Sequence, residues 1–272
     1  MVAVQSPDRQ TPALPARSFA YRQLKFWLVN YRRTWRGSIY SSVLNPVLYL
    51  GAMGLGLGQL VDARSTASLG GVSYLAFLAP GLLAAGAMQT AVGETTYPIM
   101  ASVKWLKTYQ AAIASPLRPV DLFRGHLLFV GLRLVMNAVI FLIVMAAFGA
   151  IESAWAIVMI PVALLTGLAF AAPLEAFAIT VEKETSFSLI FRFGMIPLFL
   201  FSGTFFPVSQ LPVAIRPIAY VTPLWHGVEL CRSLSLGTAA LWPSLGHVAY
   251  LLALTAVGVS VGGRTYRRRL YA

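Results

Sequence analysis

The feature that most constrains this chain is a series of apolar blocks, each about 20 residues long, separated by basic segments. A helix of that length crosses the roughly 30 Å hydrocarbon core of a bilayer. Hydrophobic residues make up 58% of the 272 residues and charged residues only 11%, too few to cover a water-soluble domain. We therefore predict an all-α integral membrane protein. Its six expected transmembrane helices are 39–60, 74–97, 126–148, 155–180, 187–206 and 242–263.

The basic residues indicate how these spans are oriented. With six spans, 17 of the 21 lysines and arginines fall on the side of both chain ends, three fall on the other side, and Arg133 lies within a span. Loops rich in Lys and Arg stay in the cytoplasm, so we expect a bacterial plasma-membrane protein with both termini cytoplasmic. A seventh span through 207–241 would move Arg264–Arg269 outside, and we reject it. The short, proline-interrupted apolar pieces of 207–241 favour a re-entrant or interfacial segment.

Three further segments flank the spans. Residues 1–18 are rich in proline and lack the apolar core of a signal peptide, which predicts a disordered cytoplasmic tail. Residues 19–37 are too basic to span, and their apolar and basic side chains separate onto opposite helix faces. We predict an interfacial amphipathic helix on anionic membrane lipid, with a solvated helix as the alternative. Residues 264–272 are expected to form a basic cytoplasmic tail.

Several kinds of chemistry find no support in the sequence. No Gly-Lys dipeptide occurs, so there is no phosphate-binding loop, and we expect no cofactor in this chain. The single cysteine and three scattered histidines, His126, His226 and His247, predict no metal site. The net charge of +12 sits between apolar blocks, which indicates membrane orientation and no nucleic-acid partner. We do not expect this chain to be an enzyme by itself.

Three charged residues fall inside predicted spans, where they are costly unless paired or hydrated. Glu94, Arg133 and Glu175 lie at similar depth on the cytoplasmic side, so we predict that they form one intramembrane polar cluster. The alternative is that the two glutamates reach independently to the head groups. Two Gly-x-x-x-Gly pairs, Gly54 with Gly58 and Gly258 with Gly262, permit close helix approach. We favour packing within one chain over a seam between two chains.

The longest cytoplasmic loop, 98–125, carries the first of several distinctive stretches. It is expected to open with a short basic and aromatic helix, Ala101–Ala112, and to break at Ser115-Pro116. With five other stretches, this region resembles the ABC transporter type-2 permeases, particularly the nodulation lipo-oligosaccharide and daunorubicin exporter branch. The matching stretches are NYRRTWRGSIYSSVLNPVLYLGAMGLGLG from Asn30, GVSYLAFLAPGLLA from Gly71, ETTYPIMASVKWLKTYQAAIASPLRPVDLFRGH from Glu94, GLAFAAPLEAFAIT from Gly167, FLFSGTFFPVSQLP from Phe199 and PLWHGVELCRSLSLG from Pro223.

The resemblance implies a six-span permease domain over 38–263 that pairs with a second permease and sits on separate ATPase subunits, which bind ATP and Mg. A second copy of the same chain is favoured over a different permease. In that family the loop after the second span docks on the ATPase through a coupling helix. The implied contact residues are Ser102, Val103, Lys104, Trp105, Leu106, Lys107 and Tyr109. The segment 207–241 would be an outer re-entrant helical hairpin, with Pro207, His226 and Arg232 at family-matching positions.

The function expected from this resemblance is export of an amphipathic, lipid-linked or drug-like substrate, driven by ATP hydrolysis on the partner. Two other classes stay open. One is an ion-coupled secondary carrier that uses Glu94 and Glu175, although such carriers usually show internal repeats and none is found here. The other is a structural membrane subunit that transports nothing.

Overall fold

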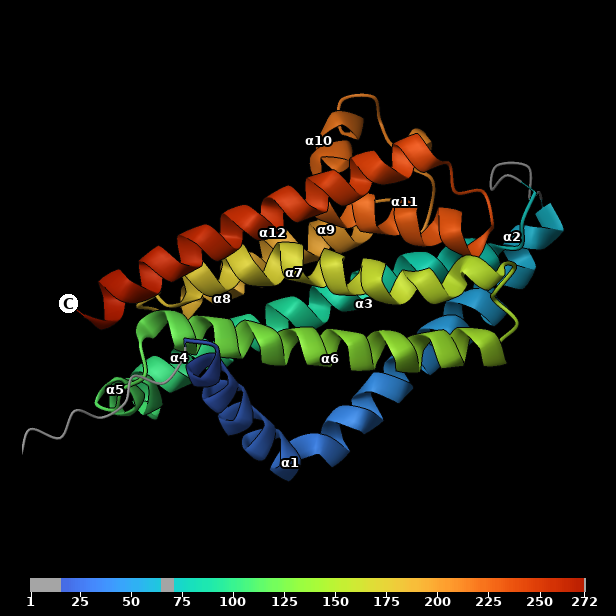
Figure 1. The fold of residues 1–272 in the computed structure, drawn as a ribbon. Coiled ribbons are helices and arrows are strands. Elements are labelled where there is room, and N and C mark those ends of the chain that lie inside the picture. The colour runs from blue at the N-terminus through green and yellow to red at the C-terminus, as the bar shows by residue number, and fades with distance from the viewer. Residues whose placement is uncertain (1–15, 65–70, 272) are drawn as a thin grey trace, which may run out of the picture.

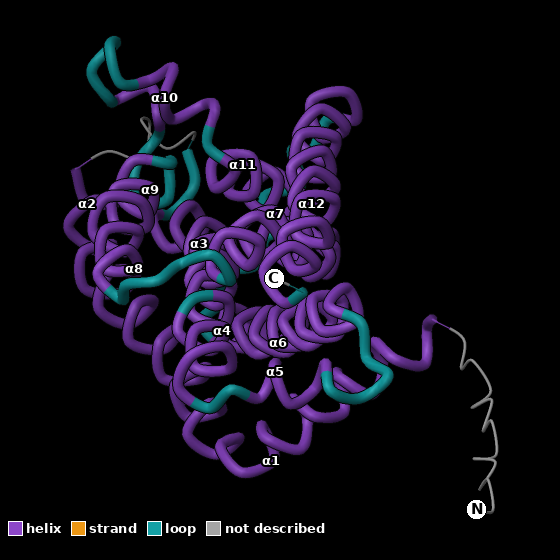
Figure 2. Tube along the Cα trace, turned by 90° about the vertical axis from the view of Figure 1, so that its left-hand side faces the viewer, coloured by secondary structure: helices purple, strands orange, loops and turns teal. Residues whose placement is uncertain are grey.

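The computed structural model describes residues 16–64 and 71–271, and this part of the chain contains helices and no strands (Figure 2). The predicted tail 1–18 therefore lies outside the described residues except for its last three, which begin α1. The α-helices are α1 (Ala16–Tyr49), α2 (Gly58–Arg64), α3 (Tyr74–Thr95), α4 (Tyr97–Met100), α5 (Thr108–Ile113), α6 (Pro119–Ala147), α7 (Met159–Ala178), α8 (Thr185–Leu189), α9 (Ile196–Phe201), α10 (Arg216–Val221), α11 (Pro223–Ser235) and α12 (Leu241–Leu270). Three π-helical segments, Leu50–Leu57, Ala101–Trp105 and Ile190–Met195, and two 3₁₀ turns, Ala154–Val158 and Val208–Gln210, join them.

Within the described residues, five helical runs are long and apolar enough to cross a membrane, and each overlaps a predicted span. They are Phe19–Asp62, Tyr74–Trp105, Pro119–Ala147, Ala154–Ala178 and Leu241–Leu270. The remaining prediction, 187–206, coincides with a shorter apolar helix, Thr185–Phe201. That helix ends before the predicted boundary because the chain turns at Gly203, which has a φ of +81°. The all-α membrane architecture is thus confirmed, and a sixth crossing stays a prediction.

The first predicted span and the interfacial helix before it form one continuous helix. Helix α1 runs from Ala16 to Tyr49 without interruption and is drawn in Figure 1 as a V with two arms. The first arm presses on α6, since a Cβ at Gly125 would lie only 2.6 Å from the carbonyl oxygen of Ala20. Trp27 and Trp35 both belong to the predicted apolar face. Trp27 is buried against His126 and Phe129 of α6, whereas Trp35 is exposed, and contact of this arm with lipid stays a prediction.

Two helices extend beyond the spans predicted for them, and where these spans enter the membrane stays a prediction. Helix α6 begins at Pro119 rather than 126, because the Asp121 carboxylate accepts the Arg118 backbone N–H at 3.2 Å and caps the helix start. Helix α12 continues to Leu270, so most of the predicted basic tail is the last turns of a helix. Basic side chains there stabilise the negative end of the helix dipole.

Helix α7 lies at the centre of the bundle, in contact with α3, α6, α11 and α12 (Figure 1). Glycines permit the tightest of these approaches. A Cβ at Gly258 of α12 would lie 2.5 Å from the Pro173 backbone nitrogen of α7, and one at Gly262 would lie 2.4 Å from the Phe123 ring of α6. A Cβ at Gly54 would lie 2.3 Å from Leu75. These glycines therefore pack within the chain, as the sequence favoured.

Candidate functional site in the helix bundle

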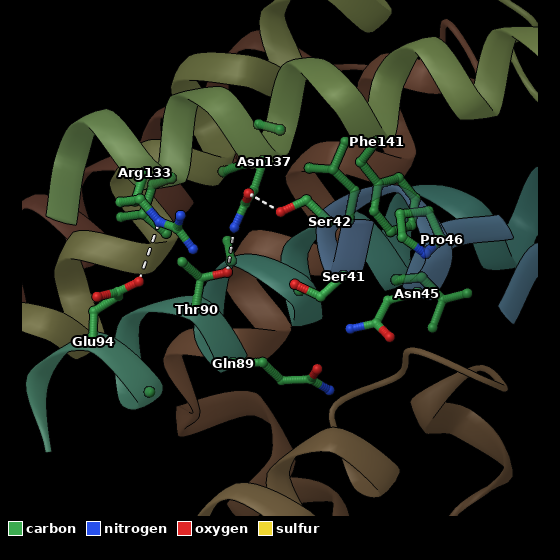
Figure 3. Close-up of a pocket in the computed structure, with 18 of the residues that line it drawn as sticks. Ser41, Ser42, Asn45, Pro46, Gln89, Thr90, Glu94, Arg133, Asn137 and Phe141 are labelled. Atoms are coloured by element: carbon green, nitrogen blue, oxygen red, sulfur yellow. Dashed lines mark hydrogen bonds and ion pairs between the residues drawn. The ribbon is translucent and has the colours of Figure 1, made fainter. Parts of the chain in front are cut away.

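A cavity of about 440 Å³ lies between α1, α3 and α6 (Figure 3). One part of its wall is apolar and aromatic, with Leu83, Phe141 and Phe199 among the lining residues. Another part is unusually polar for a membrane-spanning region, where each polar side chain needs a partner or water. The uncharged polar lining consists of Ser41, Ser42, Asn45, Gln89, Thr90 and Asn137.

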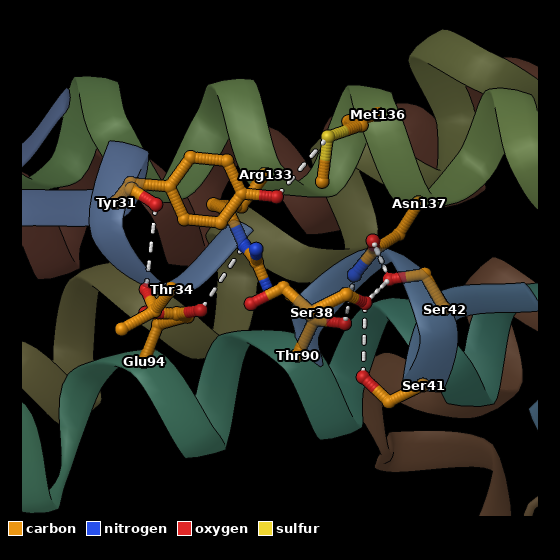
Figure 4. A network of polar contacts seen from close by, with 10 residues as sticks. All are labelled: Tyr31, Thr34, Ser38, Ser41, Ser42, Thr90, Glu94, Arg133, Met136 and Asn137. Atoms are coloured by element: carbon orange, nitrogen blue, oxygen red, sulfur yellow. Dashed lines mark hydrogen bonds and ion pairs between the residues drawn. The ribbon is translucent and has the colours of Figure 1, made fainter. Parts of the chain in front are cut away.

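A chain of hydrogen bonds joins the three helices across this cavity (Figure 4). The Ser42 hydroxyl of α1 donates to Asn137 Oδ1 of α6 at 2.7 Å, and Asn137 Nδ2 donates to Thr90 Oγ1 of α3 at 2.9 Å. Side chains that bond across helices hold spans in register in a bilayer. No motif in the sequence signals this set, because its members lie on three separate spans.

The charged pair at one end of the cavity is Glu94 of α3 and Arg133 of α6. Arg133 Nε lies 3.1 Å from Glu94 Oε1, and the guanidinium lies over the Tyr31 ring at 4.6 Å from its centre (Figure 4). Arg133 is only 8% exposed. Within the described residues its Nε and Nη1 atoms make no hydrogen bond of good geometry, although the ion pair is close. Two of the three predicted cluster members therefore meet.

Glu175 belongs to a different cluster, which corrects the prediction of a single one. Its Oε1 atom lies 3.2 Å from His126 Nδ1 and accepts a hydrogen bond from the Tyr266 hydroxyl at 3.0 Å. The two glutamates pair with different residues of α6. His126, the partner of Glu175, lies seven residues before Arg133, the partner of Glu94, which is roughly 10 Å along a helix, so the two pairs are separate. Glu175 is fully buried, so it does not reach the head groups independently.

Five elements converge on the Glu175 cluster. The Trp27 ring of α1 lies 4.4 Å from the His126 ring, tilted by 40°, and the Tyr109 ring of α5 lies 6.1 Å from the Tyr266 ring of α12. Sequence reasoning treated His126 as one of three scattered histidines. Only the packing of α6 on α7 reveals its partner, because 49 positions separate the two residues.

The loop after α3 is not one helix over Ala101–Ala112. The π-helical segment Ala101–Trp105 and helix α5 are separated at Lys107, whose φ of +50° is in the left-handed region. Trp105 and Leu106 at this break are 54% and 68% exposed, and Lys107 is exposed beside them. We refer to these three residues as the loop tip.

The other predicted contact residues are not all available at the surface. Ser102 and Tyr109 are buried, which corrects their assignment as direct docking contacts. Tyr109 turns inward because α5 packs on the end of α12, and burial raises the pKa of its hydroxyl well above the usual value. Val103 is partly buried, and the Lys104 ammonium donates to the backbone carbonyl of Glu182.

Arg232 of α11 connects three segments of the chain at the end of the bundle opposite the loop tip. Its guanidinium donates to the carbonyl oxygens of Gly203 at 2.7 Å and Phe77 at 3.2 Å, and it pairs with Glu229 at 3.0 Å. These bonds join α11 to α3 and to the turn after α9. Pro207 lies in the same region, directly before the 3₁₀ turn Val208–Gln210.

His226 also meets a partner that the sequence did not suggest. Its Nδ1 atom lies 2.7 Å from Nδ1 of His247 on α12, and the Tyr250 ring stacks on it with 4.0 Å between centres. Burial, with a smaller effect of His247, lowers the pKa of His226 to about 4. Among the described residues, no group of three His, Cys, Asp or Glu side chains gathers to hold a metal ion.

Apolar helices long enough to span a membrane, packed around a polar cavity, are the architecture of a multi-pass membrane protein. The profile of the ABC-2 type transporter family matches residues 21–236. The chain belongs to this family and is a transmembrane permease of an ABC transporter, as the resemblance predicted.

Relatives named Nodulation protein J extend the similarity over nearly the whole chain. The protein from Rhizobium leguminosarum bv. viciae is 32% identical over 252 residues, covering 90% of this chain and 95% of its own. The protein from Rhizobium meliloti (strain 1021) is 29% identical over 262 residues, covering 95% and 97%. That from Bradyrhizobium diazoefficiens is 29% identical over 269 residues, covering 97% and 98%.

Proposed function

We propose that this chain is the permease subunit of an ATP-driven exporter that moves an amphipathic, lipid-linked or drug-like substrate outward across the bacterial plasma membrane. Separate ATPase subunits would bind ATP and Mg and dock on the cytoplasmic side. A second copy of the chain would complete the permease. The segment between α9 and α12 would form the outer re-entrant hairpin.

The observation that carries this proposal is the exposed loop tip. An exposed tryptophan on a loop favours a protein contact, because aromatic anchors supply much of the binding free energy at interfaces. The tip lies beside α4 and α5, at the same end of the bundle as the C-terminal end of α12 (Figure 1). The basic residues that predict a cytoplasmic face gather at that end, including Arg267, Arg268 and Arg269.

The buried residues of the same loop connect the loop tip to the spanning helices. Tyr109, two residues after the tip, packs against Tyr266, which is hydrogen-bonded to Glu175 of the central helix. A displacement of the tip by a closing ATPase would thus reach α12 and α7 through buried, close-packed contacts.

The test is stimulation of the co-expressed ATPase by the permease in lipid vesicles. Trp105→Ala removes the aromatic anchor and should lower copurification of the ATPase and its activity by about tenfold, the cost of losing a contact of roughly 1–2 kcal/mol. The matched control is Trp242→Ala, which removes an 81% exposed tryptophan on α12, far from the tip along the bundle, and should change neither. Equal effects of the two changes, or ion-driven uptake without any ATPase, would overturn the proposal.

A further inference from the structure

The polar cavity carries two opposite charges on neighbouring walls, Glu94 of α3 and Arg133 of α6. We propose that it binds the head group of a zwitterionic amphiphile, with the oxyanion of the head on Arg133 and its ammonium on Glu94. The binding inference rests on the cavity alone. That the bound molecule is then carried outward rests on the proposed export function.

The buried cation is the first reason. Arg133 lines the cavity from α6, is only 8% exposed, and is paired with Glu94 through Nε at 3.1 Å. A buried charge is costly unless it is paired and hydrogen-bonded. A guanidinium presents parallel N–H groups that match the oxygens of a carboxylate or phosphate. An oxyanion in the cavity therefore complements this side chain.

The second reason is the charge balance of the site. Glu94 Oε1 lies 3.1 Å from Arg133 Nε, so the two charges nearly cancel at a distance. A simple anion at Arg133 would be repelled by Glu94, and a simple cation at Glu94 would be repelled by Arg133. A head group that carries both charges side by side complements both walls. Glu94 can receive an ammonium because its side chain is 22% exposed.

The remaining walls fit an amphiphile better than a small polar solute. Next to the ion pair, Thr90 and Asn137 offer a hydroxyl and an amide for the linker of a head group (Figure 3). Leu83, Phe141 and Phe199 give the cavity an apolar part. Its volume of about 440 Å³ lies within the usual range for small-molecule sites. The lining residues Ser41 and Asn45 are exposed on α1, so an acyl chain can leave the cavity along that helix.

The experiment measures lipid binding to the purified permease in mild detergent by native mass spectrometry. The probes are lysophosphatidylethanolamine and lysophosphatidylglycerol with the same acyl chain. The wild-type protein should retain the zwitterionic lipid about tenfold more than the anionic one, since one charge-assisted contact distinguishes them. Equal retention of both lipids would overturn the proposal.

Two variants sharpen the test. Arg133→Gln should lower retention of both lipids by about tenfold or more. Glu94→Gln removes the ammonium partner and the repulsion together, so the preference should shift to the anionic lipid. Because this second result is a gain of binding, loss of folding cannot produce it. An unchanged preference in Glu94→Gln would also overturn the proposal.

The matched control is Arg269→Gln, which breaks the exposed pair of Arg269 with Glu182 at 3.1 Å and should leave lipid binding unchanged. Trp105→Ala should likewise leave lipid binding intact. Failure of the lipid preference and failure of ATPase docking are therefore observed separately.

Discussion

Glu175 Oε1 receives two buried partners at once, His126 Nδ1 at 3.2 Å and the Tyr266 hydroxyl at 3.0 Å. All three side chains are fully buried, each on a different helix. The carboxylate therefore joins α6, α7 and α12 at the end of the bundle where the loop tip lies.

Removing this carboxylate should be severely destabilising. Glu175→Ala leaves the His126 and Tyr266 polar groups buried without their shared partner, and we expect the free energy of unfolding to fall by about 3–5 kcal/mol. Glu175→Gln keeps an acceptor oxygen and should cost less. The measurement is thermal unfolding of the purified permease in detergent.

The control for that change is Glu182→Gln. Glu182 pairs with Arg269 at 3.1 Å, but its side chain is 70% exposed. Exposed ion pairs contribute at most about 1 kcal/mol, so this substitution should be nearly neutral. Comparable decreases in the free energy of unfolding for Glu175→Ala and Glu182→Gln would show that the buried cluster stabilises the fold no more than the exposed ion pair does.

The approach of α12 to α7 should tolerate no side chain at its closest point. Gly258→Ala places a Cβ 2.5 Å from the Pro173 backbone nitrogen, which cannot move aside as a flexible side chain would. We expect a loss of about 1–3 kcal/mol or failure to accumulate in the membrane. Gly246→Ala on the same helix meets no atom within 4 Å and should be neutral or slightly stabilising, as expected for alanine in a helix. Protein yield and melting temperature of the two variants compare them directly.

The sequence predicted the architecture far better than the side-chain partners. Five spans could be located because their apolar blocks match the bilayer thickness, a property local in the chain. The meeting of Glu94 with Arg133 was anticipated from depth alone. The pairs of His126 with Glu175 and His226 with His247 depend on how helices rotate and pack, which no local spacing records. The same limit hid the burial of Tyr109, since an aromatic in a loop is equally suited to an interface or to a core.

The pair of histidines between α11 and α12 should make this contact sensitive to acid. His226 has a pKa of about 4, below its ordinary value of 6.5, because burial disfavours the charged ring. A lowered pKa means that the folded form prefers neutral imidazole. The contribution of His226 to the free energy of unfolding is therefore fully present above pH 6.5 and is lost as the pH falls toward 4. Melting temperatures between pH 7.5 and 4 should decline more steeply in the wild-type protein than in His226→Gln. Parallel curves for the two proteins would contradict this origin.

Tyr109 offers a way to separate the inward side of the loop from its exposed tip. Its ring is 1% exposed and packs near Tyr266, while its hydroxyl has no hydrogen-bond partner within the described residues. Tyr109→Phe keeps the ring and removes an unpaired buried hydroxyl, so stability should be unchanged or slightly raised. Tyr109→Ala leaves a cavity and should cost about 3–5 kcal/mol, the range for large aromatic truncations. In the vesicle ATPase assay, Tyr109→Phe should behave as wild type and Trp105→Ala should lose stimulation, because only Trp105 faces outward. Loss of ATPase copurification in a stably folded Tyr109→Phe protein would instead place its hydroxyl at the docking surface.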